Sequence, residues 1–334
     1  MNTDRDVEGF RWISEAEVVR LMSLGDAIEA LEWVLALEAR GEAQNMVKTH
    51  VGWGQGSTLH AIGAAVPGAG FAGTKTWAHT EGGATPLLML FDSTSGALKA
   101  VIEAFALGQL RTGGISGVAT RWLAAADAAE LAVIGTGKQM LAQVAAVAAV
   151  RPLRRVRIFS PNPAHRVQAV QRLQAAVPCA VMEAMSVAAC VEGAPIITLV
   201  TRAKQPFLTA AMVAKGAHVN AVGAITPERA EFTGDLLDRS ACVVADSIPA
   251  VRKLSREFID HCGDAEARWR TVTPLCTVVA QRAARSAGAD VTLFKAMGMG
   301  ISDLALGIEV YRRAVEQGLG MRMAQPHPAS PRLN

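Results

Sequence analysis

A glycine-rich turn is the first segment whose residue types indicate a chemistry. Gly135-Thr136-Gly137-Lys138-Gln139 follows the apolar run 131–134 and opens an alanine-rich stretch with helical spacing. The first glycine allows a tight turn and the second lets a pyrophosphate approach the backbone, whose amides at a helix N-terminus then meet the negative charge. Met140 replaces the third glycine of the usual fingerprint. We interpret the turn as a dinucleotide-binding loop; a purely structural turn is the alternative.

The end of the following predicted strand, residues 156–160, indicates which dinucleotide is preferred. NAD-preferring sites place Asp or Glu there to bind the ribose hydroxyls. This segment instead reads Phe159-Ser160-Pro161-Asn162, and Arg166 follows soon after. Because no acid repels a 2′-phosphate, Ser160, Asn162 and Arg166 favour NADP(H), with NAD(H) as the alternative. In a second interpretation Arg166 is simply solvated on the next helix and the site does not discriminate.

Three cations lie in uncharged, glycine-rich surroundings: Lys48 in MVKTH, Lys75 in AGTKTW and Arg111 in QLRTGG. A cation within an otherwise apolar segment costs desolvation energy unless an anion meets it, so these residues are candidate carboxylate ligands. For Lys48, a solvated charge on an edge strand is an equal alternative. Asp303 in SDLAL is either an N-terminal helix residue or a residue that faces the nicotinamide pocket.

Other chemistries find little support. The seven His include no HxH or HExxH pair, so no metal site is expected, and His218 is interpreted as a hydrogen-bonded core residue rather than a base. The five Cys match neither a CxxC pair nor a disulfide framework, which predicts a reducing, cytoplasmic setting. With a net charge of +3, dispersed Lys and Arg and no run of 18 apolar residues, neither nucleic acid nor membrane is an expected partner.

The elements that must position these residues fall into three stretches. Residues 13–40 predict two helices broken near residues 23–25, with Asp26 as N-cap. Residues 46–105 predict consecutive strands separated by glycine-rich turns, hence an antiparallel or mixed sheet. After a helix from about residue 107, strands and helices alternate, with strands at 131–134, 156–160, 178–183, 196–201, 218–223 and 242–246 and helices at 163–176 and 209–215.

This alternation predicts an α/β fold with a parallel sheet covered on both faces. Thr201, Val222 and Gly223 belong to the ends of two later strands of the series, and we expect them to contact the cofactor as well. After residue 246 the chain becomes charged and helical, and VTLFKAMGMGISDLALGIEVYRRAVEQ then predicts a strand, a turn and a helix.

Several segments together resemble the ornithine cyclodeaminase/μ-crystallin family and occur in the family's order between about residues 45 and 315. They are GTKTW, FDSTSGALKA, LRTGGISGVAT, VIGTGKQ, VRIFSPN, PFLTAAMVAKGAHVNAVGA and LFKAMGMGISDLALGIEVYRRA. The resemblance implies a homodimer in which a β-rich domain, residues 1–127 joined by a C-terminal helix at about 303–325, carries the substrate site and the dimer contact. Residues 128–302 would form a Rossmann-type, doubly wound dinucleotide-binding domain.

The resemblance also implies an activity on an α-amino or α-imino carboxylate. Lys75 and Arg111 match the family's carboxylate-binding Lys and Arg, whereas Lys48 stands where the family usually has a second Arg. Cyclodeaminases of the family carry an Asp at the position of Ile225, and isoleucine cannot bind a substrate's distal ammonium.

The resulting expectation is an NAD(P)H-dependent reductase of a small α-imino acid, which would run in reverse as an amino-acid dehydrogenase. The alternatives are an ornithine cyclodeaminase and a non-catalytic NADP(H)-binding protein of the μ-crystallin type.

Overall fold

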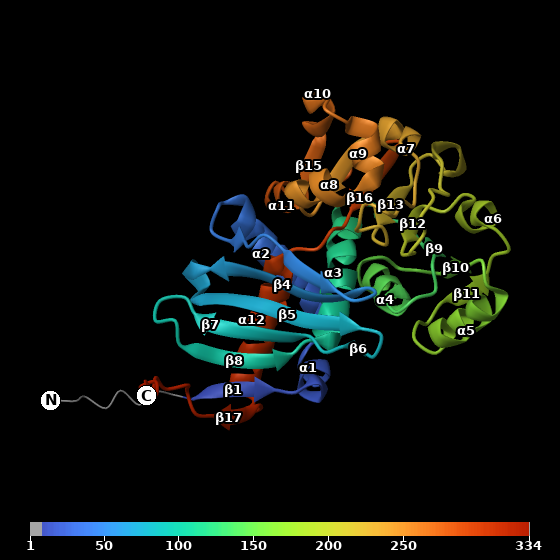
Figure 1. Cartoon of the computed structure of the whole chain (residues 1–334). Helices are drawn as coiled ribbons and strands as arrows, with labels where there is room; N and C mark the ends of the chain where they lie inside the picture. The colour runs from blue at the N-terminus through green and yellow to red at the C-terminus, as the bar shows by residue number, and fades with distance from the viewer. Residues whose placement is uncertain (1–8, 334) are drawn as a thin grey trace. The chain divides into compact units, whose positions relative to one another are not determined.

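A computed structural model describes residues 9–333, which divide into two compact units (Figure 1). Unit 1 comprises the described residues through Ser23, Gly41–Gly108 and the chain from Gly300 onward; unit 2 comprises Leu24–Arg40 and Gln109–Met299. The division differs from the predicted ranges, because it falls inside helix α3 (Phe105–Leu123) and assigns helix α2 (Leu24–Ala39) to unit 2. The reason is packing: Ile28 and Leu31 of α2 lie against Gly117 and Gly114 of α3, where no side chain intervenes.

Unit 1 is built on a mixed sheet of nine strands in the order β17-β1-β8-β7-β5-β4-β2, with β3 paired to β4 and β6 paired to β5. Strand β1 runs parallel to β8, and the other pairs are antiparallel. Its elements are β1 (Phe10–Ile13), α1 (Glu15–Leu21), β2 (Gln44–Asn45), β3 (Thr49–Trp53), β4 (Ser57–Val66), the 3-10 turn η1 (Pro67–Ala69), β5 (Phe71–Thr80), β6 (Gly83–Ala84), β7 (Leu87–Asp92), β8 (Leu98–Glu103), α12 (Gly300–Glu316) and β17 (Met321–Met323).

Helix α12 covers one face of this sheet behind β4, β5 and β7 (Figure 1). Small residues let the helix come close: a Cβ built at Gly73 of β5 would lie 3.1 Å from Leu304, and one at Gly307 would lie 2.3 Å from Leu88. The apolar side of the helix is buried there, and burying each such side chain stabilises the unit by about 1.5 to 3 kcal/mol. Consequently the first turn of α12, which contains Asp303, is held against β5.

Unit 2 contains a sheet of eight parallel strands in the order β11-β10-β9-β12-β13-β16-β14-β15. The strand order reverses between β9 and β12, and dinucleotides bind at such a switch point, beyond the carboxyl ends of the strands. Besides α2 and α3, its elements are β9 (Glu130–Ile134), α4 (Met140–Val150), β10 (Arg155–Phe159), α5 (Pro163–Gln174), β11 (Ala180–Glu183), α6 (Val187–Val191), β12 (Ile196–Leu199), the 3-10 turn η2 (Ala210–Met212), β13 (His218–Ala221), α7 (Asp235–Arg239), β14 (Ser240–Ala245), α8 (Ile248–Leu254), α9 (Arg256–Cys262), α10 (Glu266–Trp269), β15 (Val272–Pro274), α11 (Leu275–Ala280) and β16 (Val291–Lys295).

Alternate residues of β9 belong to two separate cores, one on each face of this sheet. Leu131 and Val133 pack in one core and Ala132 and Ile134 in the other, and all four are buried. Because side chains alternate across a strand, this division means that both faces are covered. The predicted α/β class, with a doubly wound parallel sheet and a second, mixed sheet, is confirmed.

Two local predictions are wrong. Asp26 is not an N-cap, because α2 already begins at Leu24 and Asp26 lies in its first turn. The helix predicted at 209–215 is only the 3-10 turn Ala210–Met212, which Pro206 and Gly216 leave little room to extend. Within residues 9–333, every helix is too short or too polar to cross a membrane. Over the same range, His, Cys, Asp and Glu side chains form no group of three that could hold a metal ion.

Candidate active site

The glycine-rich turn of unit 2 connects β9 to α4, as predicted. Gly135 has φ +120°, a conformation that favours glycine, and a Cβ built on it would lie 2.6 Å from the carbonyl oxygen of Val200. A Cβ on Gly137 would meet nothing within 4 Å, so its backbone is open to a ligand. No side chain caps α4 at its N-cap residue, Gln139. An open backbone before an uncapped helix N-terminus fits a pyrophosphate, and the residues that would hold it are Gly135, Thr136, Gly137, Lys138 and Gln139.

The predicted 2′-phosphate residues already make contacts at the end of β10. Asn162 caps α5, since its Oδ1 accepts hydrogen bonds from the N–H groups of Ala164 and His165. Arg166 is 5% exposed and therefore is not solvated. Its Nε donates to Glu183 Oε2 (3.0 Å) and its Nη1 to the carbonyl oxygen of Ser160 (2.9 Å).

Glu183 corrects the expectation that no acid lies near this position. It ends β11, and β10 and β11 are neighbours in the parallel sheet, so its carboxylate reaches Arg166 from the next strand. The sequence contained the residue but no signal that would pair it with Arg166. As a result, Glu183 already balances the charge of Arg166 when no phosphate is bound.

Glu231 organises the ends of β12 and β13, which carry the predicted cofactor residues Thr201, Val222 and Gly223. Its buried carboxylate accepts hydrogen bonds from Thr201 N (2.6 Å), Thr201 Oγ1 (2.8 Å), Gly223 N (2.8 Å) and Ala224 N (3.1 Å). A Cβ on Gly223 would lie 2.4 Å from Glu231 Oε1, so only glycine permits this approach. Burial raises the pKa of Glu231, and the Lys295 charge and the Thr201 hydrogen bonds oppose that shift.

A second buried carboxylate, Glu257, continues this network. It accepts hydrogen bonds from Glu231 N (3.1 Å), Ser255 Oγ (2.8 Å) and the ammonium of Lys295 (3.3 Å), whose Nζ also donates to the carbonyl oxygen of Ala224 (2.6 Å). Sequence reasoning missed Glu231, Glu257 and Lys295, because nothing in the local pattern distinguishes a buried charge from a solvated one.

Arg111 lies at the carboxyl edge of the same sheet. A Cβ built at Gly298, just beyond β16, would be 2.8 Å from Arg111 Nη1. Asp246 follows β14 and accepts hydrogen bonds from Met297 N (2.9 Å) and Gly298 N (2.7 Å). Burial raises the pKa of Asp246, whereas those hydrogen bonds and the charge of Arg111 act to lower it. A glycine with φ +91° thus makes room for the guanidinium.

In unit 1, Lys75 and Asp303 form a buried ion pair. Lys75 Nζ lies 2.5 Å from Asp303 Oδ1, and the two residues are 4% and 1% exposed. Asp303 lies in the first turn of α12, which agrees with one of the two predicted alternatives, and its place relative to a nicotinamide stays a prediction. Lys48 is exposed just before β3, and its ammonium lies 5.8 Å from the ring centroid of Trp77, while that of Lys75 lies 5.3 Å from it. Asp303 is thus the ion-pair partner of a lysine that has lost almost all of its contact with water.

His218 is a core residue, as predicted. It is fully buried, with Nδ1 3.0 Å from Thr292 Oγ1 and Nε2 3.1 Å from Asn220 Oδ1. Burial lowers its pKa to about 3. It is therefore a neutral structural imidazole at physiological pH.

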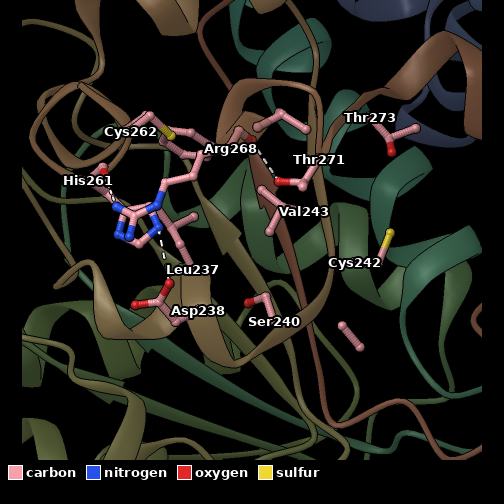
Figure 2. A pocket seen from close by; sticks show the side chains of 13 residues that line it. Leu237, Asp238, Ser240, Cys242, Val243, His261, Cys262, Arg268, Thr271 and Thr273 are labelled. Atoms are coloured by element: carbon pink, nitrogen blue, oxygen red, sulfur yellow. Dashed lines mark hydrogen bonds and ion pairs between the residues drawn. The ribbon is translucent and has the colours of Figure 1, made fainter. Parts of the chain in front are cut away.

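A cavity of about 430 Å³ is lined in part by Ser240, Cys242 and Val243 of the amino-terminal half of β14 (Figure 2). His261 and Asp238 pair at its rim, with Nε2 and Oδ1 3.3 Å apart. Cys242 and Cys262 contribute to its wall, and burial raises the pKa of both thiols. None of the predicted site residues lines this cavity.

Comparisons with known proteins agree on one family. The model of the ornithine cyclodeaminase/mu-crystallin family matches residues 10–318. A Delta(1)-pyrroline-2-carboxylate reductase of Bacillus cereus is 30% identical over 244 residues, which are 71% of this chain and 73% of the relative. An alanine dehydrogenase of Archaeoglobus fulgidus is 25% identical over 325 residues, or 93% of this chain and 97% of the relative.

The fold is shared with a solved Delta(1)-pyrroline-2-carboxylate reductase of Thermococcus litoralis in complex with NADH and L-proline. The two superpose with a TM-score of 0.87 at 23% identity, covering 94% of this chain and 100% of that one. These relatives are oxidoreductases of amino and imino acids.

Proposed function

This chain belongs to the ornithine cyclodeaminase/mu-crystallin family, and from that premise we propose that it is an NAD(P)H-dependent reductase of a small α-imino acid. In reverse it would act as an amino-acid dehydrogenase. Bound nicotinamide would supply the hydride. The protein's task is then to hold the C=N group and to offset the charge of the carboxylate beside it.

The buried Lys75–Asp303 pair is the observation that carries this proposal. A buried ammonium can bind a substrate carboxylate by a charge-assisted hydrogen bond and can deliver a proton to an imine nitrogen. Asp303 accepts a hydrogen bond from the Lys75 ammonium and so orients it. Arg111 and Lys48 are the further carboxylate ligands that we propose.

We propose NADP(H) as the preferred cofactor and NAD(H) as a weaker one. The loop from Gly135 to Gln139 would receive the pyrophosphate, and Thr201, Val222 and Gly223 would lie along the nicotinamide half. Ser160 and Asn162 would donate to the 2′-phosphate. Arg166 supports this preference because its ion pair with Glu183 balances the charge of that carboxylate near the end of β10, so that the carboxylate repels a 2′-phosphate less strongly.

A homodimer is the proposed assembly, and its interface would lie on β3 and β4. Val51 and Leu59 are register partners on one face of this strand pair and are 59% and 45% exposed, and Trp53 lies two residues further along. Contiguous exposed apolar side chains of this size mark interaction surfaces. The cytoplasm is the proposed location, since all five cysteines are free thiols.

The experiment that tests the activity mixes the protein, NADPH and pyrroline-2-carboxylate or piperideine-2-carboxylate and follows NADPH absorbance. Oxidation that depends on the imino acid supports the reductase. No oxidation with any imino acid or with pyruvate plus an amine, together with proline formation from ornithine, would overturn it in favour of a cyclodeaminase. Tight NADPH binding without turnover of any of these substrates would favour the μ-crystallin type of binding protein.

A further inference from the structure

Three rings form a row across β3, β4 and β5 of unit 1. His50, His60 and Trp77 are register partners on neighbouring strands. The two imidazoles stack with their centroids 5.5 Å apart and 26° between their planes. His60 and the indole stack at 4.8 Å and 16°. Because register partners share a face, all three rings stand on the same side of the sheet.

Further basic side chains, among them Lys75, surround this row of rings. Lys75 is two residues before Trp77 on β5 and therefore faces the same way, about 7 Å along the strand. His79 lies two residues after Trp77, opposite Thr58. The ammonium groups of both Lys48 and Lys75 lie over the Trp77 ring. Basic side chains of three adjoining segments thus converge on one indole.

His60 is the residue in the row that lies in the least favourable polar environment. Its Nε2 pairs with Thr58 Oγ1 (2.8 Å), whereas its Nδ1 is buried and has no hydrogen-bond partner among the described residues. Burial lowers the pKa of His60, and repulsion from Lys48, His50 and His79 lowers it further. An anion bound at this face would relieve the repulsion and allow the imidazole to take up a proton.

From this juxtaposition we propose that the substrate is a dicarboxylic α-imino acid, whose distal carboxylate lies against Lys48 and the His50–His60–Trp77 row. The inference rests on the proposed function, in which Lys75 and Arg111 bind the α-carboxylate, and it assigns Lys48, the third proposed carboxylate ligand, to the distal carboxylate. Along β5, Lys75 and Trp77 are about 7 Å apart, and a chain of four or five carbons with a carboxylate at each end reaches across a separation of that order. A diamine is disfavoured because the face is basic, and an aromatic side chain is disfavoured because ammonium groups already lie over the indole.

The test uses substrates that differ in charge and not in shape. In the oxidative direction, the amino acid gives a hydride to NADP⁺ and releases a proton. We expect kcat/KM for aspartate to exceed that for asparagine, or glutamate that for glutamine, by about tenfold or more. His60→Phe keeps a stacking ring and Lys48→Met keeps an apolar stem, and each should bring the acid-to-amide ratio towards one. His165→Phe, which removes an exposed imidazole of α5, should leave the ratio at its original value.

A pH profile separates a charge effect from a shape effect. The ratio should rise as the pH falls from 8 to 6 in the wild type, and this rise should be lost in His60→Phe. The titratable groups around His60 are Lys48 and His50 from the β3 side, Lys75 and His79 from β5, and Asp303 from α12 as the partner of Lys75. An identical rise in His60→Phe would assign the pH dependence to another group and contradict the role of this imidazole.

The outcomes distinguish this inference from the proposed function. Turnover of neutral or cyclic imino acids with an acid-to-amide ratio of one or less overturns the inference and leaves the reductase in place. If no amino or imino acid is turned over, the proposed function fails, and binding decides the inference separately. Succinate should then raise the melting temperature of the NADP⁺ complex more than its monoamide succinamate does, and equal shifts would overturn the inference.

Discussion

Replacing Glu231 with glutamine should loosen the carboxyl ends of β12 and β13 in unit 2, because it removes an acceptor from the backbone amides of Thr201, Gly223 or Ala224. Each carboxylate oxygen receives two donors, Thr201 N and Oγ1 at one and Gly223 N and Ala224 N at the other. An amide NH₂ in either place faces N–H groups that it cannot bond. Leaving one or two buried donors unpaired costs about 1 to 3 kcal/mol each, so we expect a loss of about 1 to 6 kcal/mol in the free energy of unfolding.

Urea unfolding measures this loss, and a fluorescence titration with NADPH measures the accompanying effect on cofactor affinity. The matched control is Glu228→Gln, because Glu228 is exposed in the same loop and should change the free energy of unfolding by less than about 0.5 kcal/mol. The expected pattern is a lowered midpoint with an unchanged m-value, together with weaker NADPH binding. Equal midpoints for the Glu231 and Glu228 variants would refute the reasoning, since the carboxylate would then not be the acceptor that holds Thr201 and Gly223.

Four further outcomes are expected. Because the pKa of His218 is about 3 in the fold and near 6.5 when unfolded, the unfolded state binds more protons between these values. The contribution of neutral His218 to stability is therefore fully present above about pH 6.5 and is lost as the pH falls from 6.5 towards 3. Between pH 7 and pH 5, the free energy of unfolding measured in urea should fall by about 2 kcal/mol more in the wild type than in His218→Gln. Arg111→Ala should raise KM roughly tenfold or more with cofactor affinity unchanged; a collapse of cofactor affinity with unchanged KM would contradict its role. Ser160→Asp should reverse the preference for NADP(H) over NAD(H) in fluorescence titrations, and equal wild-type affinities would contradict the proposed selectivity. Trp53→Glu should convert a dimer to a monomer in light scattering, and an unchanged mass would place the interface elsewhere.

Local patterns predicted much of the architecture. The glycine turn at 135–137, the strands of residues 46–105 and the alternating elements after residue 128 are each encoded by side-chain period and by turn residues within a short window. The helix around Arg111 was predicted despite its glycines, and the structure explains them, because Gly114 and Gly117 admit Leu31 and Ile28 of α2. The short strands β1 and β17 were not predicted, since each is stabilised by pairing with a distant segment rather than by its own pattern.

The residues of the candidate site also fall into two groups, those predicted from local sequence and those found only in the tertiary structure. By itself the sequence determined the glycine-rich turn between a strand and a helix and the candidate cations Lys75 and Arg111, because residue type and immediate neighbours suffice to identify such a turn or a charge in apolar surroundings. Only the tertiary structure decided which acids meet these cations and which hold the backbone. Asp303 reaches Lys75 across 228 positions of the chain, and Glu231 reaches Thr201 across 30. Such pairs depend on which strands become neighbours and which side chains lose water, and a local sequence pattern contains neither.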